Sequence, residues 1–407
     1  MDRMENTPTA AHSESTSRTS IRLHYLDWLG VLLVLGVFLF HAVHPFDTIE
    51  WHIKNPEQSE VVTYFVGFFF MWGMPLFFLV GGVGSQFALR RRSGSQFVAE
   101  RVRRLLIPFF VGAVLLSPIM IYFEQLQQAK FDGSFIAYLP EFFRSRLYAF
   151  SPKIASDWGV HLWFLGFLFL FSLIALPLFL WLKREGGHRF IKQLGRLAEI
   201  RGGILLFFVP LALVILILEP YFPDEHDWED FLFYFGFFVL GYIFYADKRF
   251  PLAVRRDGKL LAFVAIASVI ALFGISIVTG VSYNSQPGTA EFILSRVFWA
   301  LVAWSWTLLI LSISMRFLDF TNNRLEYLRE AQLPIFVLHQ PVIIVIAFFV
   351  VQWDAGILPK LLLVVGGSFL VTFGIYELLI RRIEPVQALF GMRPKRRKEV
   401  KTKTSLD

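Results

Sequence analysis

Residues 26–46 read LDWLGVLLVLGVFLFHAVHPF, and this stretch decides the fold class. A hydrocarbon core about 30 Å thick needs roughly 20 predominantly apolar residues in a helix, which is the length of this stretch. No small-residue cleavage site follows it, so a retained membrane span is predicted rather than a removed signal peptide.

Comparable apolar stretches recur along the whole chain. Of its 407 residues, 56% are hydrophobic and 17% aromatic, whereas soluble domains are roughly 45–50% apolar. We therefore expect an all-α fold, a polytopic transmembrane helical bundle of about ten spans, with the shortest at residues 231–245. The expected spans are Leu26–Phe46, Val61–Leu89, Leu105–Phe123, Trp158–Leu182, Gly203–Leu218, Phe231–Tyr245, Leu260–Val281, Phe292–Met315, Leu333–Trp353 and Ile357–Ile380.

The basic residues indicate the orientation of these spans. They gather in RRRSGSQFVAERVRR (90–104), in KREGGHRF (183–190), at 248–259 and in RPKRRKEVKTK (393–403), and loops poor in Lys and Arg alternate with them. Because cytoplasmic loops carry the excess of Lys and Arg, ten spans place both termini in the cytoplasm, N-in and C-in. The net charge of +7 is then explained by the cytoplasmic loops rather than by binding to nucleic acid. We expect the protein to lie in a cell membrane, a bacterial inner membrane, with membrane lipids as partners.

Composition divides the chain into three parts. Residues 1–21 are polar and rich in Ser and Thr, which predicts a disordered tail. Residues 22–384 are expected to form the transmembrane domain, and residues 385–407 a basic cytoplasmic tail. The longest external loop, residues 124–157, is expected to cap the outer face. The chain has no cysteine, so it forms no disulfide and no Cys-ligated metal site.

Histidines inside the spans are candidate functional residues, because polar groups at membrane depth are costly. His41 lies roughly 22 Å along the first span, with His44 on the same face and Pro45 ending or kinking the helix. The pair suits an unspecified functional role, interfacial histidines bonded to other helices, or two metal ligands. Because no third ligand follows at a recognisable spacing, no metal site is expected.

Two further histidines lie in later spans. His161 opens the fourth span at the outer face, either as an interfacial residue beside Trp163 or as part of one outer-leaflet site with His41. His339 lies roughly 9 Å into the ninth span from its cytoplasmic start, and Pro341 allows that helix to break there. It either packs against a carbonyl freed by the proline or has a functional role.

Arginines and glycines mark the inner side of the second and third spans. Arg101, Arg103 and Arg104 either anchor the helix at anionic lipid or hold a phosphorylated ligand through bidentate contacts. Gly81, Gly82 and Gly84 are expected to permit close helix approach.

Four stretches, in this order and spacing, carry a family resemblance: YLDWLGVLLVLGVFLFHAVHPFD (25–47), MPLFFLVGGVGS (74–85) followed by RVRRLLIP (101–108), HLWFLGFLFLFSL (161–173), and LPIFVLHQPVIIVIAFFVVQW (333–353). The chain resembles the membrane-bound acyltransferase 3 family, most closely its glucan biosynthesis protein C-like branch, over roughly residues 22–394. The tail EPVQALFGMRP (384–394) fits as well.

The resemblance implies transfer of an acyl group, of the acetyl or succinyl class, from cytoplasmic acyl-coenzyme A to a hydroxyl of a carbohydrate or other acceptor. It implies His41 as the catalytic residue, and Arg101 and Arg104 as the Arg-x-x-Arg element that contacts the coenzyme. We expect His41 to act as general base on the acceptor hydroxyl, or to stabilise the charge that develops as the thioester carbonyl is attacked. His161 is expected to position the acceptor or the oxyanion, and His339 to line the inner part of the path. No permanently bound cofactor is expected.

One position departs from the family pattern. Many members carry Arg or Lys eleven positions before the catalytic histidine, where this chain has Gly30. The nearest upstream basic residue is Arg22, so Arg22, or a residue of another helix, replaces that role, or activity is altered. A non-catalytic relative and a transporter or flippase for a glycan or lipid precursor are the alternative functions, although the spans hold almost no Asp or Glu for ion coupling.

Overall fold

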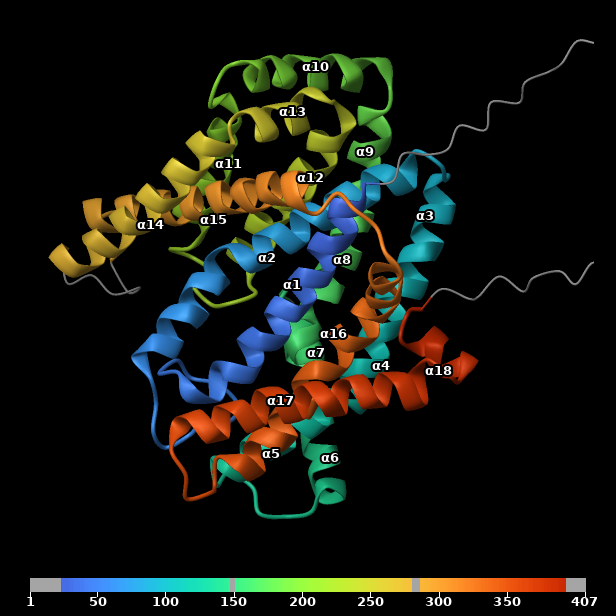
Figure 1. Cartoon of the computed structure of the whole chain (residues 1–407), viewed down its shortest axis with the longest axis vertical. Helices are drawn as coiled ribbons and strands as arrows, with labels where there is room; N and C mark the ends of the chain where they lie inside the picture. Colours follow the sequence, from blue (N-terminus) through green and yellow to red (C-terminus); the bar gives the residue numbers. More distant parts are fainter. Residues whose placement is uncertain (1–22, 147–150, 280–285, 393–407) are drawn as a thin grey trace, which may run out of the picture.

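A computed structural model describes residues 23–146, 151–279 and 286–392, and within these ranges the regular secondary structure is helical (Figure 1). Nine helical segments of the described chain are long and apolar enough to cross a bilayer. They are His24–Phe46, Glu60–Leu89, Gly94–Gln127, Ile154–Ile174, Trp228–Ala246, Gly258–Ile275, Ala290–Phe317, Asn323–Val350 and Ile357–Ile380. The shorter apolar segment Gly203–Leu218 corresponds to the remaining expected span.

The polytopic helical bundle is therefore confirmed, with differences at the ends of the segments. The stretch expected to be shortest, Phe231–Tyr245, extends to Trp228–Ala246, and Gly203–Leu218 is the short one instead. The ninth segment begins at Asn323, ten residues before its expected start, because charged residues occupy its first three turns as solvated helix. It stays helical through Pro334 and Pro341, so the break expected at Pro341 does not occur.

The transmembrane segments contain the following helices: α1 (His24–Val43), α2 (Glu60–Leu89), α3 (Gly94–Arg101), α4 (Ile107–Leu115), α5 (Ser117–Gln127), α7 (Ile154–Gly159), α8 (Trp163–Ile174), α11 (Phe208–Leu218), α12 (Trp228–Ala246), α14 (Gly258–Thr279), α15 (Ala290–Phe317), α16 (Asn323–Val350) and α17 (Ile357–Ile375). The remaining α-helices are α6 (Phe135–Arg144), α9 (Leu176–Leu182), α10 (Glu185–Glu199), α13 (Arg249–Arg256) and α18 (Glu384–Leu389). Short 3₁₀ or π turns join several of them: η1 (His44–Phe46), η2 (Val102–Leu106), η3 (Val160–Leu162), η4 (Gly203–Phe207) and η5 (Tyr376–Ile380).

The two ends of the bundle differ in charge. The basic helices α10 and α13 lie together at one end, and α5 and α6 lie at the opposite end (Figure 1). Arg256 of α13 donates to the carbonyls of Ala198, Glu199 and Ile200, which are free because α10 ends there. The separation agrees with the orientation predicted from the basic loops, which puts α10 and α13 in the cytoplasm.

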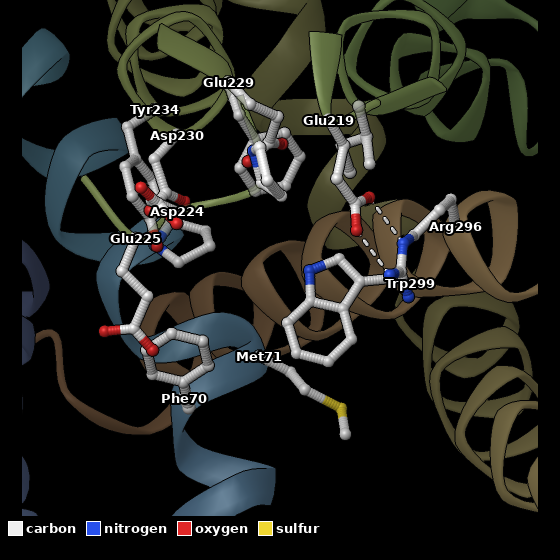
Figure 2. Close-up of a pocket in the computed structure, with 14 residues that line it drawn as sticks. Phe70, Met71, Glu219, Asp224, Glu225, Glu229, Asp230, Tyr234, Arg296 and Trp299 are labelled. Atoms are coloured by element: carbon white, nitrogen blue, oxygen red, sulfur yellow. Dashed lines mark hydrogen bonds and ion pairs between the residues drawn. The ribbon is translucent and has the colours of Figure 1, made fainter. Parts of the chain in front are cut away.

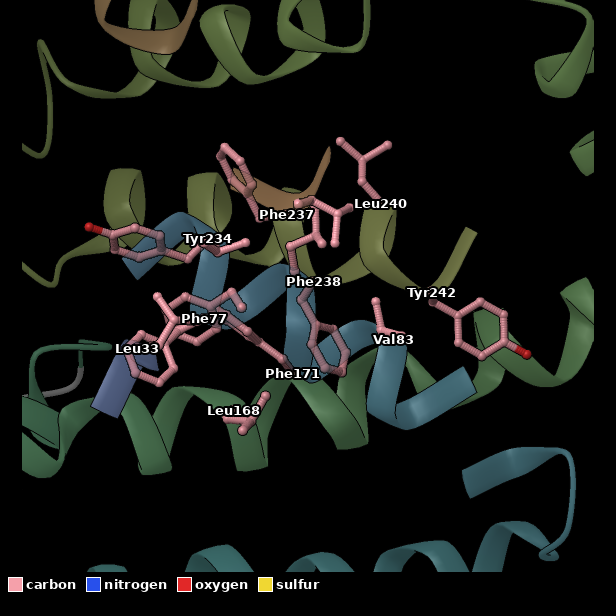
Figure 3. Close-up of a cluster of buried hydrophobic side chains, with 14 of the residues drawn as sticks. Leu33, Phe77, Val83, Leu168, Phe171, Tyr234, Phe237, Phe238, Leu240 and Tyr242 are labelled. Atoms are coloured by element: carbon pink, nitrogen blue, oxygen red, sulfur yellow. The ribbon is translucent and has the colours of Figure 1, made fainter. Parts of the chain in front are cut away.

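The centre of the bundle is packed with aromatic side chains (Figure 3). Phe78 of α2 stacks on Tyr234 of α12, with ring centroids 5.0 Å apart, and meets Phe171 of α8 at 5.2 Å. Offset and edge-on ring contacts of this kind stabilise a core beyond the apolar area that they bury. The aromatic content of the sequence therefore serves the interior of the bundle as well as its lipid-facing surface.

Glycines set the contact between α2 and α12. A Cβ added to Gly82 would lie 1.9 Å from the carbonyl oxygen of Phe238, and one added to Gly241 would lie 2.0 Å from that of Leu79. The two backbones are thus in direct contact, which only glycine allows. The expected close approach is confirmed at Gly82, whereas at Gly84 an added Cβ would meet open space.

The predicted tails lie largely outside the described residues. The N-terminal tail, residues 1–21, lies wholly outside them, as does the C-terminal part from residue 393. Helix α18 falls inside the segment predicted as a C-terminal tail from residue 385, because Gln387 donates to the carbonyl of Arg381 and ties it to the end of η5. The loop predicted over residues 124–157 contains α6 and the start of α7.

Candidate active site

The three candidate histidines converge at one place in the bundle. Nδ1 of His41, on the last turn of α1, lies 2.9 Å from Nε2 of His339 on α16. The ring of His161, in η3 before α8, meets the ring of His339 edge-on with centroids 5.3 Å apart. Residues separated by as many as 298 positions therefore form one cluster.

The depth of His339 differs from expectation. Because α16 begins at Asn323, His339 lies roughly 24 Å along it, and His41 lies roughly 26 Å along α1 from His24. The two histidines are therefore level with each other. His339 therefore lies directly beside His41, closer to it in depth than the sequence suggested.

The bonding partners determine which nitrogen of each ring carries a proton. Nδ1 of His339 lies 2.7 Å from the carbonyl oxygen of Phe336, which can only accept, so this nitrogen donates. In the neutral ring, Nε2 of His339 is then the acceptor, and Nδ1 of His41 donates to it. Nε2 of His41 therefore holds a lone pair, and in the described chain it has no hydrogen-bond partner.

His161 carries its proton on Nε2, whereas His41 and His339 carry theirs on Nδ1. Its Nε2 lies 3.1 Å from the carbonyl oxygen of Val337 and donates to it. That carbonyl is available because Pro341, four residues later, has no amide hydrogen to bond to it. Nδ1 of His161 is buried and has no partner in the described residues, so it also presents a lone pair. Pro341 thus frees the carbonyl that orients His161 without interrupting its own helix.

His44 and the loop after α1 cover the outer side of this cluster. His44 Nδ1 lies 2.6 Å from Asp47 Oδ2, and Asp47 Oδ1 lies 2.6 Å from Lys54 Nζ. Burial alone would raise the pKa of Asp47, but the bonds from His44 and Lys54 outweigh it and hold the pKa below 3.8. Trp51 stacks on the ring of His44 at 5.1 Å with an interplanar angle of 5°.

The predicted coenzyme-binding arginines lie at the junction of α3 and η2. Arg101 Nη2 donates to Ser85 Oγ of α2 at 2.9 Å, and its guanidinium lies 4.7 Å from the ring of Phe97. Arg103 is exposed, and Arg104 is partly buried. The packing of Arg101 against α2 holds it in one orientation while leaving further N–H donors for a ligand.

A residue of another helix occupies the space beside Gly30. A Cβ added to Gly30 would lie 3.1 Å from Nε2 of Gln332 on α16, which donates to the carbonyl of Asp27. The absence of a side chain at Gly30 therefore leaves space for the neutral amide of Gln332, and an Arg or Lys at position 30 would displace this amide. Arg22, the other replacement expected from the sequence, lies outside the described residues.

A cavity of about 50 Å³ lies apart from the histidine cluster, between α2, the α11–α12 loop and α15 (Figure 2). Such a volume holds a few water molecules. Its wall includes the ion pair of Arg296 and Glu219, together with Glu229 and Asp230 of α12. Arg296 was not among the residues predicted from the sequence, although a charged residue inside the expected eighth span could have indicated a polar site there.

The loop beside this cavity contains a strained histidine. His226 has a φ of +62°, in the left-handed region, and its ring contacts Trp163 with centroids 4.2 Å apart. Burial lowers the pKa of His226 to about 3, and the charge of Lys153 adds to this effect. His226 is therefore neutral at pH 7.

Comparisons with known proteins show the family of the chain. A family model described as an acyltransferase domain matches residues 23–377. Relatives called glucans biosynthesis protein C, from Salmonella paratyphi B, Salmonella enteritidis and Salmonella gallinarum, are 22% identical over 391 residues, which cover 92% of this chain and 95% of each relative. No solved structure matches. Because the model covers most of the chain, this multi-pass membrane protein belongs to the acyltransferase 3 family and is an acyl-transferring enzyme.

Proposed function

We propose that the enzyme is an O-acyltransferase that moves an acyl group from cytoplasmic acyl-coenzyme A to a hydroxyl of a carbohydrate acceptor, with His41 as general base. The observation that carries the proposal is the hydrogen-bonded chain from Phe336 through His339 to His41. This chain leaves the lone pair of His41 Nε2 available for a proton, which is what a general base requires.

In the proposed reaction, the acceptor oxygen bonds to the thioester carbonyl carbon while its proton moves to Nε2 of His41. The carbon–sulfur bond then breaks, and the same proton passes from His41 to the departing thiolate. The products are an ester and free coenzyme A, and no acyl-enzyme forms. Direct transfer is favoured because the chain has no cysteine and, in its described part, His41 has a histidine rather than a serine as hydrogen-bond partner.

His161 is suited to only one of the two roles expected for it. Its Nε2–H is already used by the carbonyl of Val337, so a neutral His161 has no hydrogen left to donate to an oxyanion. Its bare Nδ1 accepts a hydrogen bond instead. We therefore assign His161 to positioning the acceptor hydroxyl, or a second hydroxyl on the same sugar.

The donor is proposed to bind where α3 meets η2. Coenzyme A carries several phosphate groups, and guanidinium groups bind phosphate through paired, charge-assisted hydrogen bonds. Arg101 would make the principal contact, with Arg104 and Arg103 beside it. The cytoplasmic side of a bacterial inner membrane has acyl-coenzyme A, whereas the histidine cluster lies toward the outer side by the predicted topology.

The class of acceptor is supported by the relatives, whose name refers to the biosynthesis of glucans. We extend this to the present chain as a carbohydrate acceptor, reached from the outer side, and an acetyl or succinyl donor. A carbohydrate offers many hydroxyls in fixed geometry, which matches a site that presents two lone pairs, one on His41 and one on His161.

The test is to replace His41 with Ala in detergent-purified enzyme and to measure thiol release from acetyl- or succinyl-coenzyme A together with acyl incorporation into a glucan. Transfer is expected to fall by about 10²- to 10⁴-fold, the usual contribution of a general base. His188, an exposed histidine on α10, provides the matched control as His188→Ala. Full activity in the His41 variant would exclude His41 as the base.

A further inference from the structure

We infer that Trp51 is a positioning residue for His41: it holds the imidazole in place and keeps bulk water from it, so that an acceptor hydroxyl outcompetes water for the acyl group. The inference rests on the proposed function, because it concerns the same site. Its basis is the contact of one indole with His41 of α1 and His44 of η1, and the hydrogen bonds that hold the loop carrying this indole.

The indole of Trp51 covers the face that His41 and His44 share. The two histidines are three residues apart and point the same way from α1. The ring of Trp51 lies 6.2 Å from the ring of His41 at 21° and 5.1 Å from that of His44 at 5°. On the other side, Phe40 meets both imidazoles edge-on at 5.0 and 5.3 Å. His41, which is half-buried, is thus flanked by the rings of Phe40, Trp51 and His339.

The loop carrying Trp51 is fastened on one side to α1 and α5. Lys54 Nζ donates to Asp47 Oδ1 at 2.6 Å and to the carbonyl of His44 at 2.7 Å. The side-chain amide of Gln127 on α5 bonds both the backbone N–H and the carbonyl of Lys54, at 2.9 and 2.7 Å. These four bonds fix the backbone three residues after Trp51, which leaves the indole little freedom to swing away.

A second anchor comes from α17. The side chain of Lys360 is buried, and its ammonium donates to Asn55 Oδ1 at 3.1 Å and to the carbonyl of Val351 at 3.0 Å. The backbone N–H of Asn55 in turn donates to the carbonyl of Pro45 at 2.8 Å. A buried lysine that bonds a loop instead of a carboxylate is costly. This arrangement indicates that holding the loop closed is the role of Lys360.

The position of Trp51 matters because water and the acceptor compete for the same acyl group. Hydrolysis adds a water oxygen to the thioester carbonyl, breaks the carbon–sulfur bond and gives a carboxylic acid and free thiol, with His41 taking the water proton as it would take the acceptor proton. Excluding water suppresses this reaction. Removing the indole is therefore expected to raise hydrolysis relative to transfer.

The experiment compares Trp51→Ala, Trp51→Phe and Lys54→Met with Trp353→Ala, an exposed tryptophan between α16 and α17 that serves as the control. Thiol release with and without glucan gives the ratio of hydrolysis to transfer. Losing one aromatic contact is expected to raise this ratio about 2- to 10-fold in Trp51→Ala. Trp51→Phe should retain most of the wild-type ratio, and Lys54→Met should raise it while Trp51 is still present.

A second readout does not depend on catalysis. Diethyl pyrocarbonate acylates imidazole nitrogens that carry a lone pair, and mass spectrometry of the digested protein gives the modification rate of each histidine. The rate at His41 is expected to rise in Trp51→Ala and the rate at exposed His188 to stay constant. An unchanged ratio, or an unchanged rate at His41, overturns the inference. Wild-type enzyme that transfers no acyl group would instead refute the proposed function, and the modification rate would still test the shielding by Trp51.

Discussion

Replacing His339 separates the base from the residue that orients it. In His339→Ala, His41 loses the acceptor of its Nδ1–H, the 2.9 Å bond to Nε2 of His339. The proton is then free to occupy Nε2, which would remove the lone pair that the proposed reaction uses. His339 touches no reacting atom in this scheme, so its loss should reduce the population of competent His41 without abolishing catalysis.

The size of the effect follows from that one bond. A buried N–H left without a partner costs about 1–3 kcal/mol, which corresponds to about 5- to 150-fold in the fraction of His41 in the competent orientation. We expect kcat for transfer to fall by that factor, with KM for acyl-coenzyme A unchanged. His339→Gln, whose amide oxygen is an acceptor, should recover part of the loss.

The assay is steady-state transfer with each variant, after size-exclusion chromatography and thermal unfolding show that the fold is retained. Nitrogen-15 NMR of labelled histidine reports the tautomer of His41 directly. A loss in His339→Ala equal to that in His41→Ala, with the wild-type tautomer still present, would refute the positioning role. A loss below 2-fold would refute it as well, because the hydrogen bond would then contribute nothing.

Three further predictions concern the rest of the chain. Gly82→Ala places a methyl group against the backbone of α12 and should lower stability by about 1–3 kcal/mol in thermal unfolding, whereas Gly84→Ala, which faces open space, should stay within about 0.5 kcal/mol; equal losses would contradict the contact. His226→Asn should make the folded protein less sensitive to acid. The pKa of His226 is about 3 in the folded protein and near 6.5 in the unfolded chain, so the wild type loses stability as the pH falls from 6.5 toward 3, by at most about 2 kcal/mol at pH 5. Thermal unfolding of the variant, whose Asn tolerates the positive φ, should lack this loss. Arg101→Ala should raise KM for acyl-coenzyme A by about 10-fold or more with a smaller change in kcat, and exposed Arg103→Ala should raise it less; the opposite order would place the coenzyme elsewhere.

The sequence predicted the bundle because the length of an apolar helix is a local property. Each span could be located from the roughly 20 residues that a bilayer requires, and the basic loops predict the orientation without any tertiary information. The ends were harder to place. At the start of α16, charged residues between Asn323 and Leu333 form a solvated helix, which hydropathy cannot distinguish from a loop.

The site was predicted only in part, since its chemistry depends on partners in other helices. His41, His161 and His339 were recognisable as polar residues at membrane depth, yet their order in depth was wrong by the length of the solvated helix. The protonation of each ring is set by a contact across the bundle, such as the one from His161 to Val337, and no local pattern reports it. Gln332 beside Gly30 was unpredictable for the same reason.

The bond between His41 and His339 also bears on how the enzyme is made. The two residues are 298 positions apart, so His41 enters the membrane long before its partner is synthesised. At about 5–20 residues per second, the interval is roughly 15–60 s. During that time the imidazole of His41 lacks the partner that fixes its tautomer. In the proposed mechanism, insertion of α16 near the end of translation would complete the base, so chains without α16 would not consume acyl-coenzyme A.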